Sequence, residues 1–153
     1  MRFPTPYADV NFVVLDFETR TRAILKDQFL GLYLYGSLAL GDFDPYTSDI
    51  DWIVVTRGEI SDDSFTALKA MHAAFDHSPS PWAGKIEAAY IPQDALNRPA
   101  ATSVAYPQIE KGTGLLRAPL EIGWAFQRYS LRECGVVVAG PEPYTIMRSS
   151  RPG

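Results

Sequence analysis

Apolar residues recur at steps of three and four along three segments of the chain. Each segment also carries charged residues on the remaining positions, which is the pattern of an amphipathic helix. The pattern predicts helices over residues 9–29, 62–76 and 119–133. Gly31 stands where a glycine commonly ends a helix, and Pro119 suits the first turn of one. We therefore expect three long helices, the first of them directly ahead of a strand.

Short apolar runs rich in β-branched and aromatic residues separate these helices. They predict strands over residues 32–35, 52–55, 85–92 and 136–138. Residues 94–114 contain prolines, alanines and glycines without a clear period, and no element is assigned to them from the pattern.

The candidate chemistry lies between the first two strands. Gly36 and Ser37 follow the first strand, while Asp49 and Asp51 enter the second. Residues i and i+2 of a strand share a face, so the two carboxylates project together and repel each other. A cation relieves this repulsion, and oxygen ligands of this kind suit Mg²⁺ with substrate phosphates. Gly36 admits a close backbone approach to a phosphate, and Ser37 offers a hydroxyl donor.

The alternative, purely structural interpretation is a strand–turn–strand element whose aspartates only cap a turn. It accounts for Asp42 and Asp44, which read as loop residues. It leaves two same-face aspartates at a strand entrance unexplained. We also expect a short helical turn over residues 38–41, whose backbone N–H groups would favour a phosphate.

This stretch resembles the signature of the nucleotidyltransferases of the DNA polymerase β superfamily, and more closely that of the streptomycin/spectinomycin-type aminoglycoside adenylyltransferases. The matching residues are Tyr35-Gly36-Ser37, Gly41 and Ser48-Asp49-Ile50-Asp51. The spacing from Ser37 to Asp49 is one residue longer than in many members, which the loop between them can absorb.

The resemblance implies an α/β (α+β) nucleotidyltransferase fold with a small mixed central sheet flanked by helices. It implies that Asp49, Asp51 and Glu87 are catalytic and hold Mg²⁺. Glu87 stands on a predicted strand and corresponds to the glutamate regarded as the general base. Gly36, Ser37 and Ser48 would bind the nucleotide. The implied reaction transfers AMP from ATP to a hydroxyl of a small molecule, with an aminoglycoside-type antibiotic as candidate acceptor.

The resemblance extends over nearly the whole chain, through the Gly-Val-Val-Val-Ala-Gly-Pro segment at residues 135–141. It predicts a nucleotidyltransferase domain at residues 1–143 and a C-terminal tail at 144–153. Members of the aminoglycoside type continue into an all-helical domain, which is missing here. We therefore expect a homodimer or a protein partner to replace that domain, with a fragment or a minimal stand-alone domain as the other interpretations.

Net charge and composition limit the classes of partner and site that this chain can have. The 153 residues carry a formal charge of −4, so no basic field favours a nucleic acid. The single cysteine, Cys134, excludes an internal disulfide, and His72 and His77 are read as packing or surface residues because they do not share a helical face. No leader or apolar span of membrane length is visible, which predicts a cytoplasmic protein without membrane contact.

Two other functions stay open at this stage. The first is a minimal nucleotidyltransferase antitoxin that acts on a protein partner. The second is a non-catalytic nucleotide-binding module. Tyr106, Lys111 and Arg117 are weaker candidates for substrate contact, and Arg128 and Arg132 are read as a solvated helix face.

Overall fold

The computed structural model describes residues 3–98, 104–110, 114–120 and 124–148. Helices and strands alternate along the chain, as the apolar pattern indicates. In order, they are α1 (Ala8–Leu25), a 3₁₀ turn (Lys26–Gln28), β1 (Phe29–Leu34), α2 (Ser37–Leu40), β2 (Ile50–Thr56), α3 (Asp62–Asp76), β3 (Ile86–Pro92), α4 (Gln93–Leu96), β4 (Ala105–Glu110), β5 (Gly114–Pro119), α5 (Trp124–Cys134), β6 (Val136–Ala139) and α6 (Pro143–Ile146).

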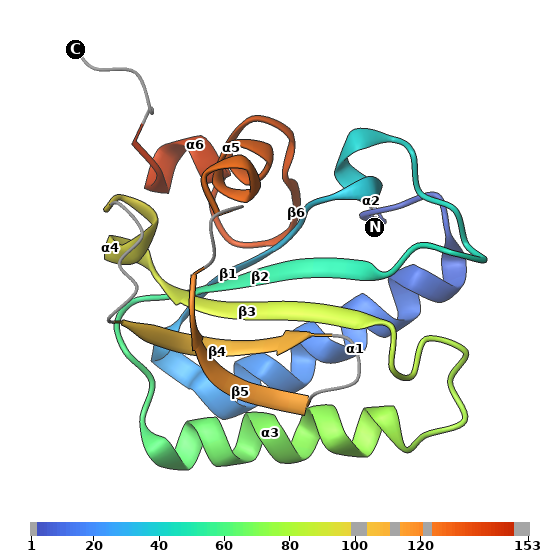
Figure 1. The fold of residues 1–153 in the computed structure, drawn as a ribbon, viewed down its shortest axis with the longest axis horizontal. Helices are drawn as coiled ribbons and strands as arrows, with labels where there is room; N and C mark the ends of the chain where they lie inside the picture. The colour runs from blue at the N-terminus through green and yellow to red at the C-terminus, as the bar shows by residue number, and fades with distance from the viewer. Residues whose placement is uncertain (1–2, 99–103, 111–113, 121–123, 149–153) are drawn as a thin grey trace.

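The described strands form one mixed sheet in the order β5-β4-β3-β2-β1-β6. Strands β2 and β3 run parallel, and the other neighbouring pairs run antiparallel. Helices α1 and α3 cover one face of the sheet, while α4, α5 and α6 lie on the opposite face (Figure 1). This is the mixed α/β architecture that the resemblance implies.

Both faces of the sheet are buried, which explains why its central strands read as continuous apolar runs. In β2, Trp52 and Val54 pack on the α1/α3 side, while Ile53 and Val55 pack on the α5 side. These four side chains are at most 1% exposed. Because side chains alternate along a strand, Asp51 shares the α5 side with Ile53 and Val55.

Several predicted elements are confirmed with little change in their bounds. Helix α3 spans residues 62–76, as predicted, and the Ser61 hydroxyl caps it by accepting a hydrogen bond of 3.1 Å from the Ser64 N–H. Strands β2, β3 and β6 occupy the apolar runs predicted for them. The short helical turn after Ser37 is present as α2.

The first helix ends earlier than predicted. It stops at Leu25, because Lys26 turns the chain with a φ of 52°, and β1 begins at Phe29. Gly31 therefore lies inside a strand and does not end a helix. A side chain at Gly31 would collide with the ring of Tyr33, whose hydroxyl donates a hydrogen bond of 2.6 Å to the Pro141 carbonyl. The glycine makes room for a neighbouring ring in the sheet.

The prediction of a helix over 119–133 is wrong at its beginning. Pro119 ends β5 and pairs with Ala105, and the described part of α5 begins at Trp124. Residues 94–114, which received no element from the sequence, include α4, β4 and the first residue of β5. Their strand pairing is with each other and with β3, so it depends on contacts that no local period records.

None of the described helices combines the length and apolar character needed to cross a bilayer.

His72 is a packing residue, as one of the two sequence interpretations holds. It is 1% exposed, and its Nε2 shares a hydrogen bond of 2.6 Å with the Tyr90 hydroxyl. Burial lowers the pKa of His72 from its ordinary 6.5 to about 4. The unfolded chain therefore binds a proton at this residue between pH 6.5 and 4 that the folded chain does not bind.

We expect the double substitution His72→Leu with Tyr90→Phe to reduce the loss of stability in acid. Both hydrogen-bonding groups are removed together, so neither is left buried without a partner. The wild type should lose on the order of 3 kcal/mol more than the variant between pH 6.5 and 4. Urea unfolding at a series of pH values measures this. Identical pH profiles for the two proteins would show that His72 does not stay neutral in the folded state.

Candidate active site

Register in the parallel strand pair brings two of the predicted acids together. Asp51 of β2 lies opposite Glu87 of β3, with adjacent strands about 4.8 Å apart. Both side chains lie on the sheet face that α5 covers, since Ile53 and Ala89, two residues further along, pack into that layer. Asp49 precedes β2 and lies close enough for its charge to act on Asp51. Asp51 and Glu87 therefore meet at the entrance of β2 and β3, with Asp49 near Asp51.

The electrostatics of this cluster are those of like charges held in a partly buried place. Burial, the Glu87 carboxyl, a hydrogen bond with Glu87 and the charge of Asp49 together raise the pKa of Asp51 from 3.8 to about 8. At neutral pH and without a cation, Asp51 therefore keeps its proton and is hydrogen-bonded to Glu87. A pair in this state is a place where a cation can replace the proton.

Tyr35 belongs to the same cluster, although the site residues predicted from the sequence do not include it. Burial and the charges of Asp51 and Glu87 raise the pKa of its hydroxyl. Its backbone N–H donates a hydrogen bond of 3.2 Å to the Asp51 carbonyl. The alternation Tyr33, Tyr35 along the strand could have placed its side chain on the face of the acids.

Gly36 is required where it stands for two reasons. Its φ of +68° lies in the region that favours glycine, and an added Cβ would come within 2.5 Å of the Asp51 Oδ2 atom. The absence of a side chain therefore leaves room for the carboxylate. Ser37 follows Gly36 as the first residue of α2.

Ser48 shapes the loop ahead of the acids. Its hydroxyl accepts a hydrogen bond of 2.9 Å from the Asp44 N–H, and the Ser48 N–H donates to the Asp44 carbonyl over 2.9 Å. The Asp44 carboxylate accepts from the Tyr46 N–H, closing a turn inside the loop. This network leads the chain into Asp49, and the predicted contact of Ser48 with a nucleotide stays a prediction.

The donor set fits Mg²⁺ that arrives with a triphosphate. In the described part of the chain, no three His, Cys, Asp or Glu side chains are arranged as a ready-made metal cage. Mg²⁺ commonly takes only one or two protein carboxylates and completes its shell with phosphate oxygens and water. Asp51 and Glu87, which lie opposite each other and are hydrogen-bonded while Asp51 keeps its proton, match that requirement.

Arg117 lies away from the acids, among the weaker candidates for substrate contact. Its guanidinium stacks 4.0 Å from the centre of the Phe65 ring and pairs with Asp62 over 3.0 Å, both on α3. Tyr106 is buried at 7% exposure in the α5 layer. Lys111 lies outside the described residues.

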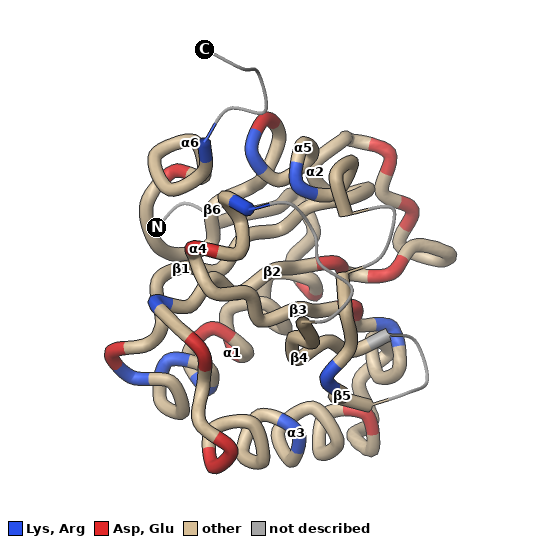
Figure 2. The backbone as a smooth tube through the Cα atoms, turned by 60° about the vertical axis from the view of Figure 1, so that its left-hand side comes forward, with Lys and Arg blue, Asp and Glu red and all other residues tan. Residues whose placement is uncertain are grey.

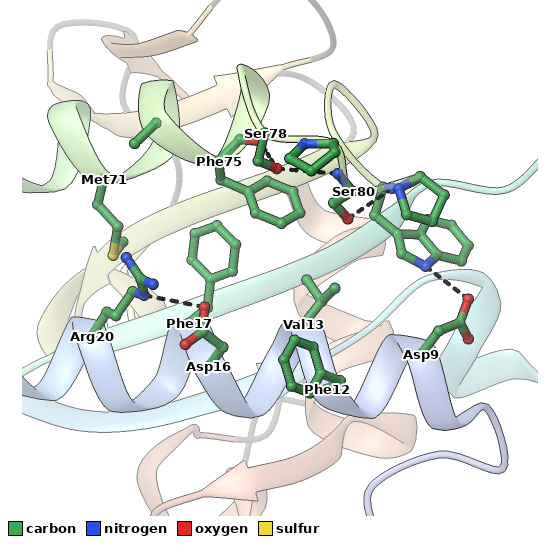
Figure 3. Close-up of a pocket in the computed structure, with 14 residues that line it drawn as sticks. Asp9, Phe12, Val13, Asp16, Phe17, Arg20, Met71, Phe75, Ser78 and Ser80 are labelled. Atoms are coloured by element: carbon green, nitrogen blue, oxygen red, sulfur yellow. Dashed lines mark hydrogen bonds and ion pairs between the residues drawn. The ribbon is translucent and has the colours of Figure 1, made fainter.

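A cavity of about 580 Å³ opens on the opposite side of the sheet, between α1, α3 and the loop at residues 78–82 (Figure 3). Its floor is apolar, with Val13 and Phe17 facing Phe75 across it (Figure 3). The Trp82 indole N–H donates a hydrogen bond of 3.1 Å to Asp9 at one end. None of the three acids lines it, so this cavity is separate from the carboxylate cluster.

Comparisons with known proteins agree with this geometry. Residues 19–92, which contain the glycine–serine corner and all three acids, match the family model described as the nucleotidyltransferase domain. A search of curated protein sequences finds no match. Among solved structures, the fold is similar to the crystal structure of spectinomycin adenyltransferase AAD(9) from Enterococcus faecialis with ATP and spectinomycin, with a TM-score of 0.70 at 19% sequence identity.

That alignment covers 94% of this chain and 60% of the other, so this chain spans about three fifths of the enzyme's length. Residues 19–92 therefore resemble the nucleotidyltransferase domain, and the fold of the chain is similar to that of the adenyltransferase. The resemblance that the glycine–serine and Asp-Ile-Asp motifs indicate is thereby confirmed.

We expect Asp51→Asn to stabilise the cation-free protein at alkaline pH. The folded pKa of Asp51 is raised above its unfolded value, so wild-type stability falls as pH rises from about 4 to about 8. Asparagine mimics the protonated carboxyl and does not titrate. The two proteins should be equally stable near pH 4, and the variant more stable by roughly 1–3 kcal/mol at pH 8.

Urea unfolding in EDTA measures this difference. The exposed substitution Glu59→Gln is the matched control and should follow the wild type across the range. A wild type that is more stable than Asp51→Asn at pH 8 would contradict the raised pKa of Asp51.

We expect Gly36→Ala to reduce nucleotidyl transfer at least tenfold, because its Cβ displaces the Asp51 carboxylate. Gly84→Ala is the matched control, with a φ of +75° and no heavy atom within 4 Å of the added Cβ. Both variants should lose about 1 kcal/mol of stability through backbone strain. Pyrophosphate release with ATP and Mg²⁺ reports the difference, and equal activity in the two variants would refute the role given to Gly36.

Proposed function

We propose that this chain transfers AMP from ATP to a hydroxyl of a small acceptor, in a Mg²⁺-dependent reaction. The observation that carries the proposal is the opposition of Asp51 and Glu87 on neighbouring parallel strands, with Asp49 beside them and Gly36 making room for them. The family match over residues 19–92 and the ATP in the crystal structure of the similar enzyme support the nucleotide. An aminoglycoside-type antibiotic is the candidate acceptor, because that crystal structure also contains spectinomycin.

Asp49, Asp51 and Glu87 would hold Mg²⁺, which when bound neutralises the charge of the triphosphate. Gly36 lets the phosphates approach the backbone, and the Ser37 hydroxyl donates a hydrogen bond to a phosphate oxygen. Glu87 accepts the proton of the acceptor hydroxyl. The acceptor oxygen forms a bond to the α-phosphorus as the bond to the leaving pyrophosphate breaks. The sheet contributes mainly by holding these groups in place.

Protonation of Asp51 sets a condition on cation binding. Without a cation the pKa of Asp51 lies near 8, so at lower pH a proton competes with Mg²⁺ for this carboxylate. Activity at limiting Mg²⁺ should therefore increase from mildly acidic to mildly alkaline pH.

A protein acceptor or partner is the second candidate. Large apolar side chains are exposed on the layer that carries the acids, with Leu40 of α2 50% exposed and Phe126 and Tyr129 of α5 58–65% exposed. Elements α2 and α5 contact each other, so these side chains belong to one region of the surface. A second copy of the chain or another protein would remove this apolar surface from water. This supports both the proposed partner and the antitoxin alternative.

We expect Asp49→Asn and Glu87→Gln each to lower pyrophosphate release from ATP by two orders of magnitude or more, with the fold retained. Asp42→Asn, which removes an exposed carboxylate from the same loop, is the matched control and should retain activity. The assay takes ATP and Mg²⁺ with aminoglycosides and candidate proteins as acceptors. Full activity of either acid variant would refute the catalytic assignment. Calorimetric binding of Mg·ATP without transfer to any acceptor would instead favour the non-catalytic module.

A further inference from the structure

Arginines gather at the end of the sheet opposite the three acids. A cavity of about 380 Å³ is lined there by Arg57, Gln93, Asp94, Asn97, Arg98 and Arg148. Arg57 follows the end of β2, and Gln93 follows the end of β3. The cavity thus opens outside the carboxyl ends of the parallel strand pair, a common position for ligands in sheets that contain parallel strands.

The charge at this place is strongly positive in a chain whose formal charge is −4. Three guanidinium groups and one carboxylate line the cavity, and that carboxylate, Asp94, already pairs with Arg98 over 3.4 Å. Arg128 and Arg132 of α5 donate hydrogen bonds to the carbonyls of Arg148 and Met147, next to this cavity. In Figure 2, segments in the colour of lysine and arginine lie near α4, α5 and α6. Burial, and to a lesser extent the charge of Arg132, lower the pKa of Arg128 beside the cavity.

Hydrogen bonds between the surrounding elements hold this cluster in place. The Asn97 side chain donates a hydrogen bond of 3.0 Å to the Ile146 carbonyl and accepts one from the Arg148 N–H, so it fastens the end of α6 to α4. Arg128 donates to the carbonyls of Leu96 and Arg148 across the same junction. The Arg57 Nε donates a hydrogen bond of 2.8 Å to the Asp27 carbonyl, which fixes its guanidinium at the rim.

We propose that this cluster, lined by Arg57, Arg98 and Arg148, is a binding site for a small phosphate-bearing anion. Guanidinium groups match phosphate oxygens in charge and geometry, and the Gln93 carboxamide adds neutral hydrogen-bonding capacity. An anion seated in the cavity would be attracted by all three guanidinium charges. The cavity is of a size for a small ligand and not for an extended polymer.

The site is separate from the candidate active site. Asp51 and Thr56 stand five residues apart on β2, which corresponds to about 17 Å along the strand. Asp49, Asp51 and Glu87 repel a free phosphate unless a divalent cation is present. Removing divalent cations therefore leaves the arginine site as the place where an anion binds, and the proposal does not depend on the nucleotidyltransferase chemistry.

Calorimetric titration with inorganic pyrophosphate in EDTA at low salt tests the proposal on the full chain. We expect the wild type to bind and the double variant Arg98→Gln with Arg148→Gln to bind at least tenfold more weakly. Arg20→Gln is the matched control, since it removes an exposed, ion-paired arginine from α1, and it should bind like the wild type. Asp51→Asn should also bind like the wild type, because the acids do not hold the anion. Urea unfolding confirms that each variant is folded.

Several outcomes would overturn the site: no binding by the wild type, equal binding by the wild type and the double variant, or equal weakening in Arg20→Gln. Titration with ADP in EDTA then distinguishes the source of the phosphate. Tighter binding of ADP than of pyrophosphate, lost in the double variant, supports a nucleotide ligand. Equal binding of the two supports recognition of the phosphate groups alone.

Discussion

The repulsion between Asp51 and Glu87 is the constraint on which the site depends. Parallel register places the two carboxyls side by side on a partly buried face, and neither can move away without disturbing the central strands of the sheet. In the absence of a cation the pair retains a proton far above the usual pH range of a carboxyl. The packing of the apolar strands thus holds two acids close together. This arrangement is unfavourable without a cation, and a divalent cation would make it favourable.

The surroundings of the pair are consistent with this role. Gly36 has no side chain, which leaves room for the Asp51 carboxylate. Hydrogen bonds between Asp44 and Ser48 close the loop before β2. On the other face of the sheet, α1 and α3 bury an aromatic layer that includes Phe17 and Trp52, whose rings lie 4.8 Å apart. That layer supports β2 from behind, so the position of the acids follows from packing on both faces.

The two ends of the parallel strand pair have opposite electrostatic character. The acids stand where β2 and β3 begin, and the arginines stand where these strands lead into Arg57 and α4. Such a division would direct a cation to one end of the molecule and an anion to the other. The apolar surface of α2 and α5 lies on the same layer as the acids, which makes this layer the natural place for an acceptor or a partner.

The sequence by itself predicted the strands around the site, helix α3 with its Ser61 cap, and the three acids as candidate site residues. Each of these predictions depends on local spacing, namely alternation along a strand, the period of a helix, or a short motif. It assigned no element to residues 94–114 and misplaced the ends of the first and last long helices. A glycine such as Gly31 or a proline such as Pro119 can stand at the end of a helix or in a strand, and the local sequence does not distinguish these two cases. Only pairing with other strands shows that both residues lie in the sheet. The register of β2 against β3, the membership of Tyr35 and the arginine cluster likewise required the tertiary structure, since they join side chains from segments that are far apart in the chain.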